Sequence, residues 1–336
     1  MLGAIISVLA IYFIARQIDL PALWRALTEA RYIYVIPAAL LLLVGQMTRA
    51  LRWQVLLGGA LPFRRAFSIT NVAYLVNAIL PLRMGEVARA YLATRTDPPV
   101  PVLKSASTII VERLLDLLAV MVLLGLALAA APLPDAYRAT AVVLVPSVVV
   151  GFLLLVVLSR QRAFAHRMLN WVSGWLPAAA KKYALSEWLD HFLDGLTPLT
   201  QPRALLLVLL WTVCSWGFST VAGYILMLAF FEQASWVTTC LYIAASSLAI
   251  AVPAVPGSLG PFEISILVAL NATGYGDLYD TAAAFALVVH GVNLVVFTLA
   301  GLIGFIQEGI SLGQLSQGVQ QIRQQRMVTQ DAVSTE

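Results

Sequence analysis

The sequence predicts an all-α polytopic membrane protein with two inverted-topology repeats, each containing a re-entrant broken-helix hairpin, and with interfacial amphipathic helices. Three observations lead to this prediction. Hydrophobic residues make up 60% of the 336 residues and charged residues only 11%, whereas a soluble domain carries about 25% charged residues. Long apolar runs recur along the chain, and two of the apolar regions are interrupted by proline and glycine. Lysine and arginine gather in alternate loops.

Crossing a hydrocarbon core of ~30 Å takes about 20 apolar residues in a helix. We expect such membrane helices at 2–18, 32–51, 104–131, 139–158, 203–231 and 281–306. The interrupted apolar regions are 66–96, broken at "LPLRMG", and 236–271, broken at "VPAVPGSLG". Segments 19–30, with Asp19 as a candidate N-cap, and 160–202 place large apolar residues on one face, which is typical of helices lying in the membrane interface.

The loop charges predict the orientation of each span. Lysines and arginines concentrate in 49–65, 95–104, 160–203 and the polar tail, whereas 232–235 and 271–280 have none. The positive-inside rule therefore places the first group, with both termini and the tail 311–336, in the cytoplasm. Loop 16–31 is the exception, because it contains three arginines but falls outside. Both ends of 66–96 then lie inside and both ends of 236–271 outside, so we expect two re-entrant hairpins of opposite orientation.

This arrangement divides one transmembrane domain, 1–310, into two inverted repeats of the kind found in many transporters. The boundaries expected are repeat one at about 32–131, a linker span at 139–158, the interfacial segment 160–202, and repeat two at about 203–306. Short motifs recur between the halves. They are Pro81, Gly85 and Glu86 against Pro256, Gly260 and Glu263, and Arg113 and Asp116 against His290 and Asn293.

Charged residues concentrate around the first break and in the helix that follows it. Glu112 lies ~12 Å along the helix from Lys104, at a depth where an unpaired charge costs several kcal/mol. Three arginines and three carboxylates would make a neutral set: Arg83, Arg89, Arg113, Glu86, Glu112 and Asp116. The opposite half supplies Glu263 and His290, and Asn77 and Asn293 add uncharged hydrogen-bonding groups. The expected backbone hinges are Pro81, Gly85, Pro256, Gly257 and Gly260.

Two interpretations of this cluster stay open. It is either a structural ion network that joins two broken helices, or a binding site for a phosphate-bearing head group. Irregular backbone at membrane depth must line protein or water, free helix N-termini attract anions, and arginine binds phosphate through two hydrogen bonds. We interpret Arg49, Arg52 and Trp53 as anchors of a helix end at the cytoplasmic interface, with Arg49 also within reach of a head group.

Four motifs give the chain a resemblance: "RALRW" (49–53), "NAILPLRMGEVAR" (77–89), "VERLLDLL" (111–118) and "VPGSLGPFE" (255–263). Together they resemble the lysylphosphatidylglycerol synthase transmembrane region, a flippase-like family, over about residues 1–310. The resemblance implies two inverted repeats and movement of a lipid between leaflets. Larger family members continue into a soluble aminoacyl-transferring domain, which we do not expect here, so aminoacyl transfer is not implied.

We therefore expect a lipid translocator of the cytoplasmic membrane that moves a phospholipid or polyprenyl phosphate through a polar cavity. The alternatives are an intramembrane enzyme acting on lipid phosphates and a lipid-binding accessory subunit of a glycosyltransferase. No recognisable catalytic, nucleotide-binding or metal-binding motif occurs in the sequence, so we expect neither an enzyme nor a cofactor. The expected partner is a membrane lipid with an anionic head group and not a nucleic acid. A second copy of the chain, a glycosyltransferase or a lipid-modifying enzyme stays open as a protein partner.

Overall fold

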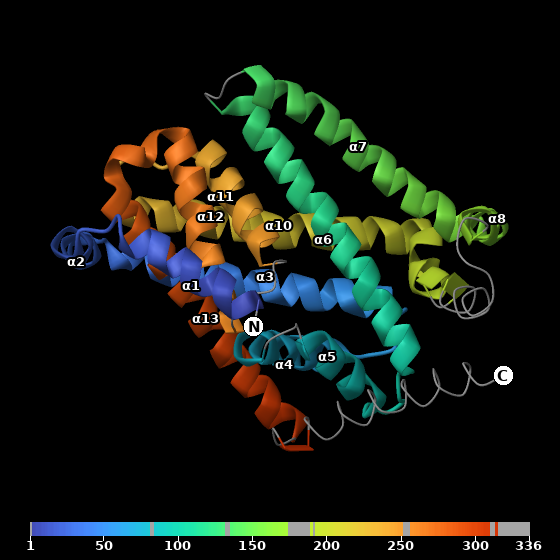
Figure 1. Ribbon diagram of the computed structural model, residues 1–336. Helices are drawn as coiled ribbons and strands as arrows, with labels where there is room; N and C mark the ends of the chain where they lie inside the picture. The colour runs from blue at the N-terminus through green and yellow to red at the C-terminus, as the bar shows by residue number, and fades with distance from the viewer. Residues whose placement is uncertain are drawn as a thin grey trace.

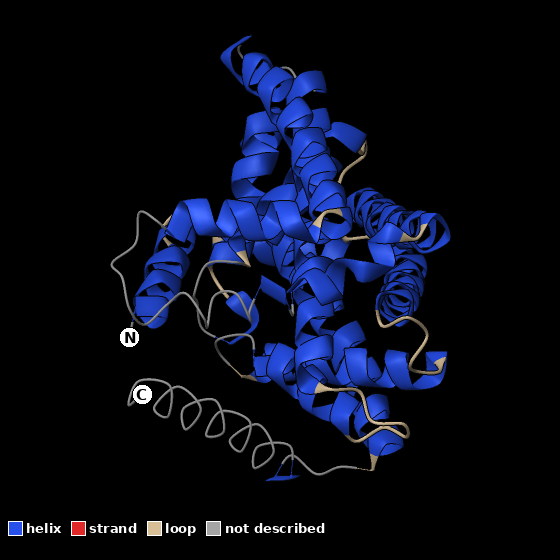
Figure 2. Ribbon diagram, turned by 90° about the vertical axis from the view of Figure 1, so that its right-hand side faces the viewer, coloured by secondary structure: helices blue, strands red, loops and turns tan. Residues whose placement is uncertain are grey.

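The computed structural model describes residues 2–80, 84–131, 135–173, 189–190, 192–250, 256–309 and 313–314, which are helices and short connections with no strand. The first half forms α1 (Leu2–Ala15), α2 (Leu20–Glu29), the 3-10 helix η1 (Tyr32–Tyr34), α3 (Val35–Leu56), α4 (Phe63–Ile79), α5 (Met84–Thr94) and α6 (Val102–Ala130). The second half forms α7 (Asp135–Arg160), α8 (Arg162–Ser173), η2 (Thr197–Thr200), α10 (Pro202–Phe230), α11 (Trp236–Ala249), η3 (Pro256–Ser258), α12 (Pro261–Leu270), η4 (Asn271–Tyr275), η5 (Gly276–Leu278) and α13 (Tyr279–Glu308). Figure 2 shows the all-helical fold.

The chain is a multi-pass membrane protein. Among the described residues, three helical stretches are long and apolar enough to cross a membrane, Tyr32–Leu56, Pro202–Phe230 and Pro261–Glu308. They contain the predicted spans 32–51, 203–231 (to Phe230) and 281–306. The predicted helices at 2–18, 104–131 and 139–158 are present as α1, α6 and α7. The outward faces carry large apolar side chains such as Ile306, Val142 and Val213, which are 70–80% exposed, as expected of surfaces in contact with lipid.

The segments predicted to lie in the membrane interface form helices where the structure describes them. Helix α2 has no buried residue, and α8 exposes Trp171 at its surface. Asp19 is the N-cap residue of α2, as predicted, although its side chain makes no capping hydrogen bond. Its backbone N–H instead donates to Oδ1 of Asp280, at 2.9 Å, which ties α2 to the start of α13.

The first broken region is helical on both sides of its interruption. Leu80 is extended (φ −103°, ψ 142°), the conformation that a following proline imposes on its neighbour. Asn77 Oδ1 accepts a hydrogen bond from the backbone N–H of Gly85, at 2.8 Å, and so joins the end of α4 to the start of α5. A Cβ on Gly85 would lie 2.0 Å from the carbonyl oxygen of Ala73, so glycine is required for the close contact of the two helices.

The second broken region uses glycines with positive φ. Gly257 (φ 74°) and Gly260 (φ 94°) turn the chain between α11 and α12, in a conformation that glycine adopts readily. Pro261 then begins α12, where a missing N–H costs nothing. The backbone N–H of Gly260 donates to Oε2 of Glu263 at 2.7 Å. The break and the glutamate that caps it therefore form one local unit.

The packing of the two halves follows one pattern, visible in Figure 1. Helices α3 and α10 run side by side through the body, α4 packs on α13, and α6 packs on α11. Within each half, α4 packs on α5 and α5 on α6, as α11 packs on α12 and α12 on α13. If α3, α4, α5 and α6 are matched in order with α10, α11, α12 and α13, every contact named here has an equivalent contact in the list. The contact of α4 with α13, for example, is equivalent to that of α11 with α6.

Small residues allow the close crossing of α4 and α13. A Cβ on Gly301 would lie 2.4 Å from Leu75 Cβ, and one on Gly304 would lie 2.8 Å from the carbonyl oxygen of Ser68. The Ser68 hydroxyl donates to the Gly304 carbonyl at 3.1 Å. Close backbone approach of this kind supplies the packing that holds membrane helices together.

Candidate functional site

Four charged side chains form a buried network inside the helical body: Arg52 of α3, Arg89 of α5, and Glu112 and Asp116 of α6. Their residues are 0–6% exposed. Arg89 binds Glu112 through two hydrogen bonds of 2.9 and 3.1 Å. Arg52 donates to Asp116 at 2.8 Å and approaches Glu112 at 3.4 Å. Because each charge faces an opposite one, the network leaves no buried charge without a compensating partner.

Further polar contacts extend this buried network to α10. The Thr212 hydroxyl accepts from Arg52 at 3.2 Å, and the indole N–H of Trp216 donates to Asp116 at 3.2 Å. The guanidinium of Arg89 lies over the ring of Trp53, 3.9 Å from its centre. The buried network thus joins α3, α5, α6 and α10, which belong to both halves of the chain.

Three further charged side chains form an accessible rim beside the buried network: Arg113, Glu86 and Arg49. The side chains of Arg113 and Glu86 are 33% and 30% exposed and approach each other at 3.4 Å. Arg113 also approaches Glu112 at 3.4 Å and Asp116 at 3.5 Å. These separations exceed the 2.7–2.9 Å of a good charge-assisted hydrogen bond. Arg113 is therefore held loosely, in contrast to Arg52 and Arg89.

Arg49 completes the rim and changes the charge balance. It donates to the Tyr74 hydroxyl at 3.2 Å and lies 4.0 Å from Asp116. The buried network and the rim together contain four arginines and three carboxylates, so these described residues have one positive charge in excess. The sequence prediction of a neutral set was incomplete, because it counted neither Arg49 nor Arg52.

The interpretation of Arg52 and Trp53 as interface anchors is wrong. Both residues are fully buried, because α3 continues to Leu56 and turns these side chains toward α6 and α10. The signal for Arg52 was present in its spacing. Gly45, Thr48, Arg52 and Leu56 recur every three to four residues and are all buried, which marks one inward face of a helix.

The second half places Glu263 and His290 together. The carboxylate oxygen Oε1 of Glu263 contacts His290 Nδ1, while its other oxygen caps α12. The two side chains are 7% exposed, and the imidazole packs against the ring of Phe262. Asn293 donates to the carbonyl oxygen of Val289 within its own helix, at 2.8 Å.

The two breaks approach each other in space. A Cβ on Gly257 would lie 3.8 Å from the carbonyl oxygen of Ala78, at the end of α4, and 3.9 Å from Nε2 of His290. The second break therefore lies beside the helix that leads into the first. Arg83 and Pro81 lie outside the described residues, as does the side chain of Pro256. The substrate-binding roles of the predicted site residues stay predictions.

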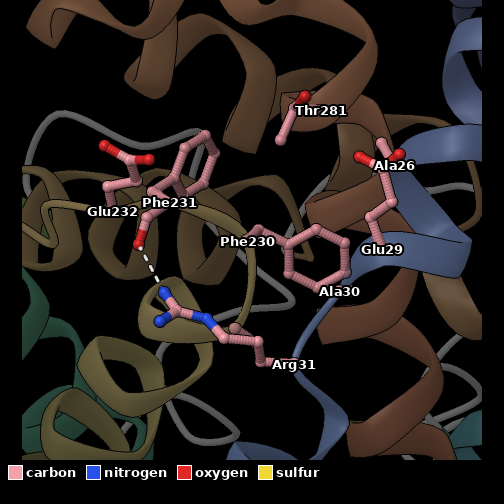
Figure 3. Close-up of a pocket in the computed structure, with 9 residues that line it drawn as sticks. Ala26, Glu29, Ala30, Arg31, Phe230, Phe231, Glu232 and Thr281 are labelled. Carbon is pink, nitrogen blue, oxygen red and sulfur yellow. Dashed lines mark hydrogen bonds between the residues drawn. The ribbon is translucent and has the colours of Figure 1, made fainter.

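A separate cavity of about 290 Å³ lies where α2, the end of α10 and the start of α13 meet, and Figure 3 shows its lining residues. Arg31 points there toward the last carbonyl oxygens of α10. It donates to Leu228 at 2.8 Å and to Phe231 at 3.4 Å. This contact explains one arginine of the exceptional loop 16–31, because a cation stabilises the carboxyl end of a helix.

No group of three or more metal-ligating side chains occurs in the described residues. One protein family, described as the lysylphosphatidylglycerol synthase TM region, matches residues 1–301. The chain belongs to this family. A lysylphosphatidylglycerol synthase transmembrane region suggests a lipid-related function at the membrane. Searches among curated proteins and among solved structures found no match to this chain.

Proposed function

We propose that this lysylphosphatidylglycerol synthase transmembrane region is a lipid translocator that binds a phosphate-bearing head group at Arg113 and Arg49. The observation that carries the proposal is the accessible rim with its loosely held cation. A phosphate can form two parallel hydrogen bonds with Arg113, and these would be shorter than its present contacts with carboxylates. The excess positive charge of the rim and the buried network favours an anionic ligand.

The buried network below the rim serves a structural role in this proposal. Its charges are already paired at short distances, and its side chains have almost no access to solvent or lipid. It fixes α6 against α3, α5 and α10 and so holds Arg113 in place. Both interpretations of the charge cluster therefore apply, the structural one to the buried network and the ligand-binding one to the rim.

The packing pattern supports two inverted repeats around this site. Each contact within the first half has a counterpart in the second, as expected of duplicated units. The loop charges give the broken regions opposite orientations. Such repeats, with interrupted helices near the site, are the usual basis of alternating access in transporters.

Reconstitution into liposomes tests the proposal. The purified protein is incorporated with a fluorescent phosphatidylglycerol, and a membrane-impermeant quencher reports how much lipid reaches the outer leaflet. We expect wild type to move lipid, Arg113→Ala to lose most of this rate and Arg113→Lys to keep part of it. Arg64→Ala is the matched control, because Arg64 is exposed and lies outside the rim and the buried network.

Equal rates in all four proteins would show that the rim does not bind the head group. No movement by wild type, with either phosphatidylglycerol or a polyprenyl phosphate, would contradict translocation itself. Thin-layer chromatography of the same samples tests the enzymatic alternative, because a converted lipid migrates differently. Movement without conversion is the expected result.

A further inference from the structure

The two halves contain equivalent ion pairs, which we call the first pair (Glu86–Arg113) and the second pair (Glu263–His290). Each glutamate is the third residue of the helix that follows a break, α5 or α12. Each basic partner is the twelfth residue of the long helix that follows, α6 or α13. Both pairs therefore join the same two positions of their repeat.

The two pairs differ in exposure. The side chains of the first pair are 30% and 33% exposed and lie 3.4 Å apart, whereas those of the second pair are 7% exposed and in direct contact. In transporters built from inverted repeats, alternating access arises when one repeat moves against the other around the site, so unequal conformations of the two halves are expected in each state. In the other state, the conformations of the two halves would be exchanged.

An apolar cavity of about 300 Å³ reaches the second pair from the side of α1. It is lined by Ile11, Ile14, Leu259, Leu267 and Leu287, with Glu263 as the charged residue of its wall. Helix α1 packs beside the break, because a Cβ on Gly260 would lie 2.8 Å from Ala10 Cβ and 3.0 Å from the carbonyl oxygen of Ser7. The second pair thus combines a charged group with adjoining space for hydrocarbon, the two features that a lipid requires.

We propose that the second pair is a second head-group site, equivalent to the first and closed in this conformation. In the exchanged state, Glu263 and His290 separate and become accessible, and His290 binds the phosphate-bearing head group while the lipid chain occupies the apolar cavity. The first pair is then closed. The inference rests on the proposed function and adds to it a residue set for the opposite leaflet.

Carboxylate labelling of the full-length protein tests this exchange. A water-soluble carbodiimide with glycine methyl ester modifies accessible carboxylates, and mass spectrometry of peptides quantifies the products. Exposed Glu29 of α2 serves as the internal reference. In wild type, we expect Glu86 to react several-fold faster than Glu263.

The decisive variant is His290→Gln, which removes the imidazole that contacts Glu263 and holds the second pair closed. We expect labelling of Glu263 to rise several-fold and labelling of Glu86, in the unaltered half, to fall several-fold. Ser265→Ala is the matched control, because Ser265 lies in α12 two residues beyond Glu263 and its hydroxyl donates within its own helix, to the Phe262 carbonyl at 2.7 Å. His290→Arg keeps a basic partner for Glu263 and is expected to keep the wild-type pattern.

Unchanged labelling of Glu86 in His290→Gln would overturn the proposal, since the two pairs would then open independently. Unchanged labelling of Glu263 would overturn it too. If His290→Gln does not fold, wild type with dioleoylphosphatidic acid gives the same measurement, because a transported lipid populates both states. Labelling of Glu86 should then fall as that of Glu263 rises, and any other pattern contradicts alternation. Lipid movement without this reciprocity would refute the inference alone, whereas reciprocity without lipid movement would refute the proposed function and, with it, the head-group role of the second pair.

Discussion

Replacement of Arg52 by leucine should separate the structural role of the buried network from the binding role of the rim. The substitution leaves Asp116 buried without its closest cation. Removing one partner of a buried ion pair typically costs 3–5 kcal/mol. Asp116 keeps the N–H of Trp216 at 3.2 Å and the loose contact to Arg113 at 3.5 Å, so we expect about 3 kcal/mol, at the lower end of that range.

Arg113→Leu gives the contrasting result. Its side chain is one-third exposed and its ion pairs are 3.4–3.5 Å long, so its removal should cost at most about 1 kcal/mol of folding stability. The expected outcome is therefore opposite for the two arginines. Arg52→Leu mainly lowers the free energy of unfolding, whereas Arg113→Leu mainly lowers the rate of lipid movement, with little loss of stability.

Unfolding by SDS in mixed micelles, followed by tryptophan fluorescence, measures the free energy of unfolding for each variant. Arg64→Leu is the exposed control. The double variant Arg52→Leu with Asp116→Asn removes both charges and should recover about 2 kcal/mol of the loss, which a double-mutant cycle detects. A cost below about 1 kcal/mol for Arg52→Leu, the value expected of an exposed pair, would refute the division into buried network and rim.

Two further predictions concern backbone and helix ends. Gly85→Ala should abolish folded protein in gel filtration, because its Cβ would lie 2.0 Å from the carbonyl oxygen of Ala73. The control Gly217→Ala has open space around its Cβ and should be neutral or stabilising by up to about 1 kcal/mol. Arg31→Ala should cost about 0.5–1.5 kcal/mol in the same SDS unfolding assay by removing the hydrogen bond to the Leu228 carbonyl. It should leave lipid movement intact, and a loss of movement at unchanged stability would contradict this structural role.

The broken helices were predictable from the sequence because their causes are local. Proline excludes the helical conformation in the residue before it, as at Leu80, and glycine supplies positive φ, as at Gly257 and Gly260. Long apolar runs predicted the spanning helices for an equally simple reason, since lipid admits few other structures. Features of this kind depend on neighbours in sequence and not on the rest of the fold.

The partners of the charged residues were less predictable. The pairing of Arg89 with Glu112 brings together residues 23 positions apart, and that of Arg52 with Thr212 spans 160 positions. Which side chains contact each other depends on how the helices pack, for example α3 along α10. The residues of one motif do not specify that packing. The burial of Arg52, by contrast, was indicated by its spacing with Gly45, Thr48 and Leu56, and only its partners depended on the tertiary fold. The recurring motifs did match Glu86 with Glu263 and Arg113 with His290, but that Glu86 contacts Arg113 and Glu263 contacts His290 came only from the structure.

Under the proposed function, the looseness of Arg113 matters because a translocated lipid must also leave its site. A cation held by short bonds, like Arg89, would have to lose strong contacts before it could bind a phosphate. A cation without any partner would bind phosphate tightly and release it slowly. Arg113 lies between these extremes, since three carboxylates approach it at 3.4–3.5 Å. These carboxylates compensate its charge whenever the lipid is absent, so that binding and release differ little in free energy. Such a balance suits a head group that binds at the rim transiently.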